Sequence, residues 1–272
     1  MPDTSSPPAN LFPAGQKPRP QATIRTILAL MLREMSTTHG RSALGYIWAI
    51  LEPVAGILLL TAVFSLMVRS PALGTSFPLF YASGLIPFMA YMDIGQKVSV
   101  ALRFSKPLMF YPGVTFVDAL VARFLMNSIT QIMVAGILLG AIILISGVDL
   151  LFDPIAIAHG FFMGLSLALG IGTLNCYLLS VYPIWERTWA VVNRPMFLIS
   201  GIIFLPDAVP PPYREWMLWN PLIHIVGEVR KGVFTTYDAA YVDPLYVYTI
   251  SLSTLSVGLL LLRRYNRDIV NL

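Results

Sequence analysis

Long apolar segments constrain this chain more than any other feature of its sequence. Of its 272 residues, 56% are hydrophobic and only 12% are charged, whereas a soluble domain carries about a quarter charged residues. Uncharged runs long enough to cross the hydrocarbon layer of a bilayer, which takes about 20 helical residues, recur along the chain. We therefore predict an all-α integral membrane protein, because the runs lack the alternation that the strands of a membrane barrel require.

We predict six membrane spans. They lie at residues 43–68, 78–96, 118–146, 154–182, 188–205 and 245–262. The second span ends near Asp93 and Lys97, and the fifth contains Arg194 and Pro195, so that a kink or a late start is expected there. Asp93 and Lys97 are four residues apart on one helical face, which favours mutual neutralisation over a role in transport.

The basic residues predict the orientation. With both termini in the cytoplasm, that side receives most of the cations: Lys17, Arg19, Arg25, Arg33, Arg41, Arg103, Lys106, Arg187, Arg194, Arg263, Arg264 and Arg267. The far side receives Arg69, Arg214, Arg230 and Lys231. This bias follows the positive-inside rule.

The segments outside the spans also have recognisable patterns. Residues 1–22 are Pro-rich and polar and predict a disordered cytoplasmic tail. Residues 23–40 predict an amphipathic helix in the membrane interface. Residues 41–268 form the permease domain, and 269–272 a C-terminal tail. Within residues 206–244, two short helices that meet at Asn220–Pro221 would dip into the outer leaflet as a re-entrant hairpin.

The chain lacks the motifs of an enzyme. It has no phosphate-binding G-x-x-x-x-G-K-[ST] loop and no nucleophile elbow. Its three histidines, His39, His159 and His224, are far apart and predict no metal site, and His159 is expected to be a satisfied histidine inside the helix bundle. We expect no cofactor in this chain, and any ATPase that drives it must be a separate subunit. Its cations flank apolar runs, which argues against nucleic-acid binding.

The loop at residues 103–117 predicts a coupling site for such an ATPase. It combines the basic Arg103 and Lys106 with Phe104, Phe110 and Tyr111, which look exposed. Aromatic and basic anchors of this kind are typical of protein interfaces. The alternative is a turn at the membrane surface whose aromatic residues belong to the interfacial belt.

Glu52 and Pro53 stand inside the first span. A carboxylate about 16 Å along the helix from Arg41 costs a few kcal/mol unless it faces water or a partner. Glu52 therefore marks either a polar transport path beside a bend or a buried structural hydrogen bond.

Aromatic residues gather at the cytoplasmic boundary. Tyr46, Trp48, Trp185 and Trp189 are either interfacial anchors or stacking surfaces for a sugar polymer. Our candidates for the substrate path are Arg41, Tyr46, Trp48, Glu52 and Trp185.

Three ordered stretches resemble a known family. GRSALGYIWAILEP at 40–53, RFSKPLMFYPGVTFVDALVAR at 103–123 and WNPLIHIVGEVRKGVF at 219–234 resemble permeases of polysaccharide-export ABC transporters, ABC-2 type exporters, and most closely those for capsular polysaccharide. The likeness covers residues 24–268.

The resemblance implies a homodimer with two ATPase subunits, which bind ATP and Mg, and a path lined by the first and fifth spans. It also implies a lipid-linked polysaccharide cargo in the bacterial inner membrane, with a periplasmic co-polymerase and an outer-membrane export protein as partners. The rivals are a permease for O-antigen or a small lipophilic compound, and a membrane-embedded glycan or lipid transferase.

Overall fold

The computed structural model describes residues 20–36, 44–109, 113–146 and 152–271, and the described part is helical, without strands. Its long helices are α2 (Leu44–Met67), α3 (Phe77–Ser99), α5 (Phe116–Ser146), α6 (Pro154–Val181) and α10 (Pro244–Asn271). The shorter elements are α1 (Pro20–Glu34), α4 (Ala101–Ser105), η2 (Lys106–Leu108), α7 (Ile184–Ile199), η3 (Pro206–Ala208), α8 (Tyr213–Met217) and α9 (Pro221–Val233). Among the described helices, the five long ones have the length and composition to cross a membrane.

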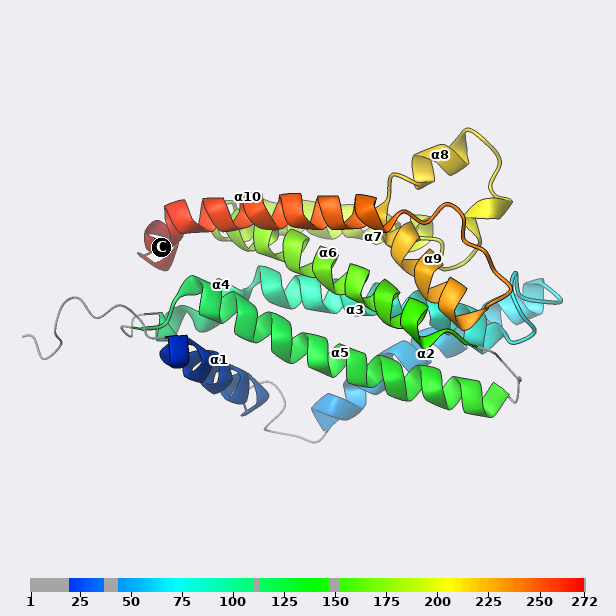
Figure 1. The fold of residues 1–272 in the computed structure, drawn as a ribbon, viewed down its shortest axis with the longest axis horizontal. Helices are drawn as coiled ribbons and strands as arrows, with labels where there is room; N and C mark the ends of the chain where they lie inside the picture. The colour runs from blue at the N-terminus through cyan, green and yellow to red at the C-terminus, as the bar shows by residue number, and fades with distance from the viewer. Residues whose placement is uncertain (1–19, 37–43, 110–112, 147–151, 272) are drawn as a thin grey trace, which may run out of the picture.

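The long helices form one elongated bundle (Figure 1). Helix α1, α4 and the C-terminus lie at one end, which we call the α1 end, and α8 and α9 lie at the other, the α9 end. Helix α10 continues to Asn271, through most of the residues expected to form the C-terminal tail. Helix α1 begins at Pro20, earlier than expected, because proline is favoured at the first position of a helix.

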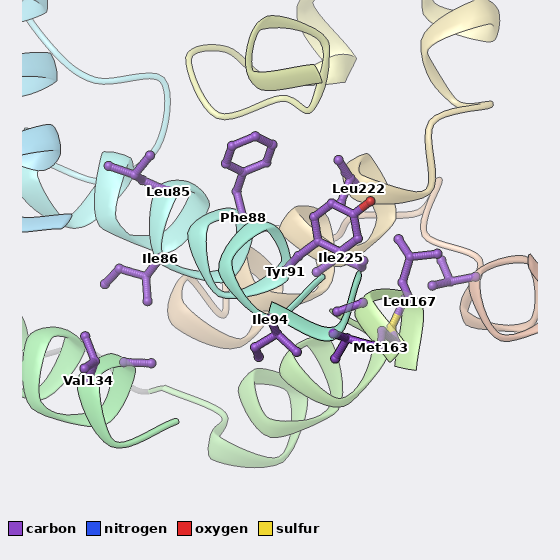
Figure 2. Close-up of a cluster of buried hydrophobic side chains, with 14 of the residues drawn as sticks. Leu85, Ile86, Phe88, Tyr91, Ile94, Val134, Met163, Leu167, Leu222 and Ile225 are labelled. Atoms are coloured by element: carbon purple, nitrogen blue, oxygen red, sulfur yellow. The ribbon is translucent and has the colours of Figure 1, made fainter. Parts of the chain in front are cut away.

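Helix α3 is the centre of the bundle and contacts α2, α5, α6 and α9. Figure 2 shows its side chains directed at the neighbouring helices. The labelled residues are Leu85, Ile86, Phe88, Tyr91 and Ile94 of α3, Val134 of α5, Met163 and Leu167 of α6, and Leu222 and Ile225 of α9. The window of α3 that could cross a membrane is 72% buried, so this helix lies inside the protein instead of facing lipid.

Glycines permit close contact between α6 and α10. A Cβ atom at Gly170 would lie 2.3 Å from the Ser251 carbonyl oxygen, and one at Gly258 would lie 2.7 Å from the Leu174 nitrogen. Small residues replace the hydrophobic effect as the determinant of helix association inside a membrane, because they let backbones approach.

The fifth predicted span differs from the structure. Helix α7 has 16 residues and ends at Ile199, so the expectation that helix continues to residue 205 is wrong. The chain turns at Gly201, whose φ is 74°, a conformation that favours glycine. The carbonyl groups of Gly201, Ile202 and Phe204 then accept hydrogen bonds from the Arg230 side chain instead of from a further helical turn.

Two short helices flank Asn220–Pro221, as the sequence predicts. The Asn220 side chain caps α9 by accepting a hydrogen bond from the Leu222 nitrogen at 3.1 Å, and Pro221 occupies the first turn. Helix α9 is buried along nearly its whole length against α3 and α6. Helix α8 projects sideways from the α9 end (Figure 1).

Candidate functional site

A polar groove lies between α2, α3 and α5. Its volume is about 510 Å³, and its polar lining comes from Glu52 of α2, from Asp93, Gln96 and Lys97 of α3, and from Thr130 and Gln131 of α5. Trp48 lies one turn before Glu52, also lines the groove and is 64% exposed. Two of the predicted path residues therefore share one polar surface.

Charge within the groove is largely balanced on α3. The Lys97 Nζ atom donates to Asp93 Oδ2 at 2.8 Å, and the Gln131 amide donates to the same oxygen at 2.7 Å. This confirms the predicted pairing of Asp93 and Lys97. Glu52, in contrast, is exposed on the groove wall, so its position favours the path interpretation over a buried structural hydrogen bond.

The polar surface continues along α3 towards α7. A second, smaller hollow shares Met92 and Gln96 with the groove and is also lined by Asn175, Trp189 and Asn193. The Trp185 indole donates to Asn175 Oδ1 at 2.9 Å, and its ring stacks on Trp189 with centroids 6.2 Å apart. Polar groups therefore follow one face of α3 from the α2 side to the α7 side.

None of the remaining predicted path residues is among the described residues that line the groove of Trp48 and Glu52. Trp185 borders the second hollow through Asn175 and Trp189, not the groove that holds Trp48 and Glu52. Arg41 and the side chain of Tyr46 lie outside the described residues.

The predicted coupling loop begins with α4 and η2, at the α1 end. Arg103 donates to Glu186 Oε2 of α7 at 3.2 Å and also to the carbonyl oxygen of Leu179. Lys106 is half-buried in η2, while Phe110 and Tyr111 lie outside the described residues. Arg103 therefore links this loop to the start of α7.

Phe104 does not have the exposed position that the sequence suggested. It is half-buried, with the Arg123 guanidinium 4.1 Å from its ring centre and that of Arg33 at 5.5 Å. A phenyl ring attracts cations on its face, which explains this packing. Phe104 thus joins α4 to α1 and α5 inside the protein.

Glu34 ties α1 to α5 in a buried polar cluster that the sequence did not predict. Its Oε1 atom accepts a hydrogen bond from the Asn127 amide at 3.1 Å and lies 3.5 Å from the Arg123 Nε atom. All three side chains are at least nine-tenths buried. The signal in the sequence was Arg123, an ionisable residue within a predicted span. The sequence did not show that Glu34 would be its partner.

Arg230 is the centre of a second buried polar cluster that the sequence did not predict. It is fully buried, donates to the carbonyl oxygens of the turn after α7, at 2.7 Å for Ile202 and 3.3 Å for Phe204, and lies 4.3 Å from the Phe80 ring centre. Burial lowers the pKa of Arg230 to about 10, so the side chain stays protonated at neutral pH. The cation therefore supplies the donors that an irregular backbone needs away from water.

A third polar contact joins α6 to α9. The His159 Nδ1 atom lies 2.8 Å from Glu228 Oε1, which confirms that His159 is a satisfied histidine of the bundle. Among the described residues, no group of three or more His, Cys, Asp or Glu side chains is arranged to hold a metal ion.

The arrangement is that of a polar surface between helices long and apolar enough to cross a membrane, and comparison with known proteins identifies its class. The ABC-2 type transporter family matches residues 25–234. The chain belongs to the ABC-2 type transporter family. Three relatives show where in that family it lies.

The polysialic acid transport protein KpsM of Escherichia coli is 32% identical over 239 residues, covering 88% of this chain and 92% of KpsM. The capsule polysaccharide export inner-membrane protein BexB of Haemophilus influenzae is 24% identical, and CtrC of Neisseria meningitidis serogroup A, with the same description, is 21% identical. Each of these two alignments covers 90% of this chain and 92% of the relative. This ABC-2 chain is thus similar to capsule export permeases over nearly its whole length.

Proposed function

We propose that this ABC-2 chain is the permease subunit of an exporter that moves a lipid-linked capsular polysaccharide across the bacterial inner membrane, driven by ATP hydrolysis in a separate subunit. The observation that carries the proposal is the polar face of α3 between α2 and α7. A saccharide chain needs hydrogen-bonding groups and aromatic faces along its route. Gln96 on this face of α3 is joined by Trp48 and Glu52 of α2 and by Asn175 of α6.

The proposal includes a homodimer. Helix α2 is mostly exposed, and none of the residues of α7, all of which the structure describes, is buried. The polar face of α3 is open between these two helices. A second copy placed against α2 and α7 would close the groove into a conduit with two polar walls.

Two ATPase subunits would dock at the α1 end. There the loop that contains Arg103, Phe104 and Lys106, with Phe110 and Tyr111 beyond, would receive the closure of the ATPases upon ATP and Mg binding. Two internal links support transmission of that movement: Arg103 bonds to Glu186 of α7, and Phe104 packs on Arg123 of α5. Closure can change the conduit only through contacts that differ between its two states.

The membrane topology follows from the same proposal. The α1 end would be cytoplasmic, because it holds Arg25, Arg33, Arg103, Lys106, Arg263 and Arg264. Helix α7 would be a short sixth span, α1 an interface helix and α8–α9 a re-entrant hairpin. The α9 end would then face the periplasmic co-polymerase and the outer-membrane export protein.

O-antigen or a small lipophilic compound is the alternative cargo. A drug pump should carry its cargo through an apolar lateral cavity. The groove of Trp48 and Glu52, which we assign to the path, offers polar groups that suit a saccharide instead. A transferase would require catalytic groups in the groove, where Asp93 is already neutralised by Lys97.

The experiment compares Glu52→Ala with the control Glu215→Ala, which removes an exposed carboxylate from α8. Surface polysaccharide is measured in cells that lack the native gene, together with the amount of permease and of co-purified ATPase. We expect export to fall several-fold for Glu52→Ala and to stay normal for Glu215→Ala. Normal export by Glu52→Ala would remove Glu52 from the path, and surface polysaccharide in cells without any permease would disprove the function.

A further inference from the structure

An apolar groove lies between α5 and α6, in the halves of these helices that are nearer the α9 end. Its volume is about 600 Å³, within the range of small-molecule sites. Every described residue that lines it is apolar, including Gly136 and Gly140 on one wall and Ile157, Phe161 and Phe162 on the other. A Cβ atom on either glycine would have no atom within 4 Å outside its own helix, so these glycines hollow the wall without serving a helix contact.

The surroundings of the groove restrict what can fill it. Both walls belong to helices that are long and apolar enough to cross the membrane. Protein interiors are close-packed, and an unfilled hollow forfeits the dispersion contacts of its lining. A hollow between two such helices, with a described lining that is apolar, matches the hydrocarbon chain of a lipid.

The position of the groove argues for a bilayer lipid over a second copy of this chain or the exported cargo. In Figure 1, α5 and α6 lie towards the viewer, while α2 and α7 lie behind them. The α5 residues that line the apolar groove, such as Ile132 and Gly136, are not the ones that line the polar groove, Thr130 and Gln131. The apolar groove therefore faces away from the surfaces that the dimer and the conduit would use.

A cation lies one residue along the chain from Gly232, which packs beside the α9 end of the groove. The Asp153 nitrogen, just before α6, donates to the Gly232 carbonyl oxygen at 2.7 Å. A Cβ atom on Gly232 would lie 2.7 Å from Ile157, which lines the groove. Lys231, next to Gly232, is exposed, while the Asp153 carboxylate is engaged in capping α6. We propose that the groove binds one acyl chain of a bilayer phospholipid, with its phosphate beside Lys231.

Photolabelling tests the acyl chain. The protein with its ATPase is placed in nanodiscs of phosphatidylglycerol that contain a small fraction of the same lipid with a diazirine on its acyl chain, and labelled peptides are quantified. Gly140→Leu fills the groove, and Ala158→Leu fills it from the other wall if the first variant folds poorly. The control, Ser256→Leu, places a leucine side chain at an exposed position of α10.

We expect labelling to concentrate on α5 and α6 and to fall at least fivefold in the filled variants, with no change for Ser256→Leu. Even labelling of all lipid-facing helices, unaffected by Gly140→Leu, would overturn the site. So would a disulfide between two copies that carry Gly140→Cys, because a second protomer would then occupy the groove.

Neutralising the cation tests the headgroup. At a limiting amount of probe, Lys231→Gln should lower groove labelling about threefold, while Arg69→Gln, another exposed cation at this end, should leave it unchanged. Equal labelling for both variants would overturn the phosphate assignment. These measurements require no export, so they can fail or succeed independently of the proposed cargo.

Discussion

Arg230→Met should destabilise the α9 end of the protein by a calculable amount. The substitution keeps most of the side-chain volume but removes the donors to Gly201, Ile202 and Phe204. Leaving a buried acceptor unsatisfied costs about 1–3 kcal/mol. Loss of the donor to the two better-bonded carbonyl groups, those of Gly201 and Ile202, would therefore lower the free energy of unfolding by about 2–6 kcal/mol. Methionine avoids the desolvation penalty of a buried cation, which brings the expected net loss to about 2–3 kcal/mol.

The assay is thermal unfolding of the purified permease in one detergent. At about 2–4 °C per kcal/mol for a protein near this size, the midpoint should fall by about 4–12 °C. The unfolding midpoint of Arg230→Lys should lie between those of the wild type and of Arg230→Met, because an ammonium group cannot present the guanidinium's fork of donors. Arg264→Met, which removes an exposed cation from α10, should leave the midpoint unchanged. An Arg230→Met midpoint equal to that of wild type would refute the idea that this side chain supports the turn after α7.

Two further perturbations concern the α1 end. Replacing Phe110 or Tyr111 with aspartate should lower ATP-driven export several-fold while the permease still inserts, because a charge would oppose an aromatic contact with the ATPase; unchanged export and co-purification would exclude that contact. Glu34→Ala and Glu34→Gln both leave Arg123 as a buried cation without its carboxylate, at a cost of about 3–5 kcal/mol. Glu34→Ala should lower the unfolding midpoint further, because the amide oxygen of glutamine can still accept the Asn127 hydrogen bond, whereas alanine offers no acceptor. Identical midpoints for the two variants would argue against this pairing.

The sequence predicted those elements whose formation depends on local composition. Long apolar runs give helices near the expected positions, and Pro221 starts α9 directly after Asn220, because proline is favoured in the first turn of a helix and disfavours helix at the residue before it. The pair Asp93–Lys97 was also predictable, since residues four apart meet on one helical face.

The end of the fifth span and the packing of Phe104 were not predictable in this way. Helix α7 stops at Ile199 because Arg230, distant in sequence, satisfies the turn that follows. Phe104 looked exposed because its loop is polar, but Arg33 and Arg123 come from two other helices to cover it. Gly201 is a local signal for the end of α7, but the donors that stabilise the turn come from Arg230. The packing of Phe104 leaves no signal within its own loop.

By itself, the amino-acid sequence determined that this chain lies in a membrane, which segments become helices and where the basic residues gather, because hydropathy and helix geometry act over about 20 neighbouring residues. Only the tertiary structure decided which buried charges are paired, how Trp48, Glu52 and Gln96 come to share a groove, and where α5 and α6 separate. Those outcomes depend on how closely helices from distant parts of the chain can approach, and this is set by the three-dimensional fit of their side chains.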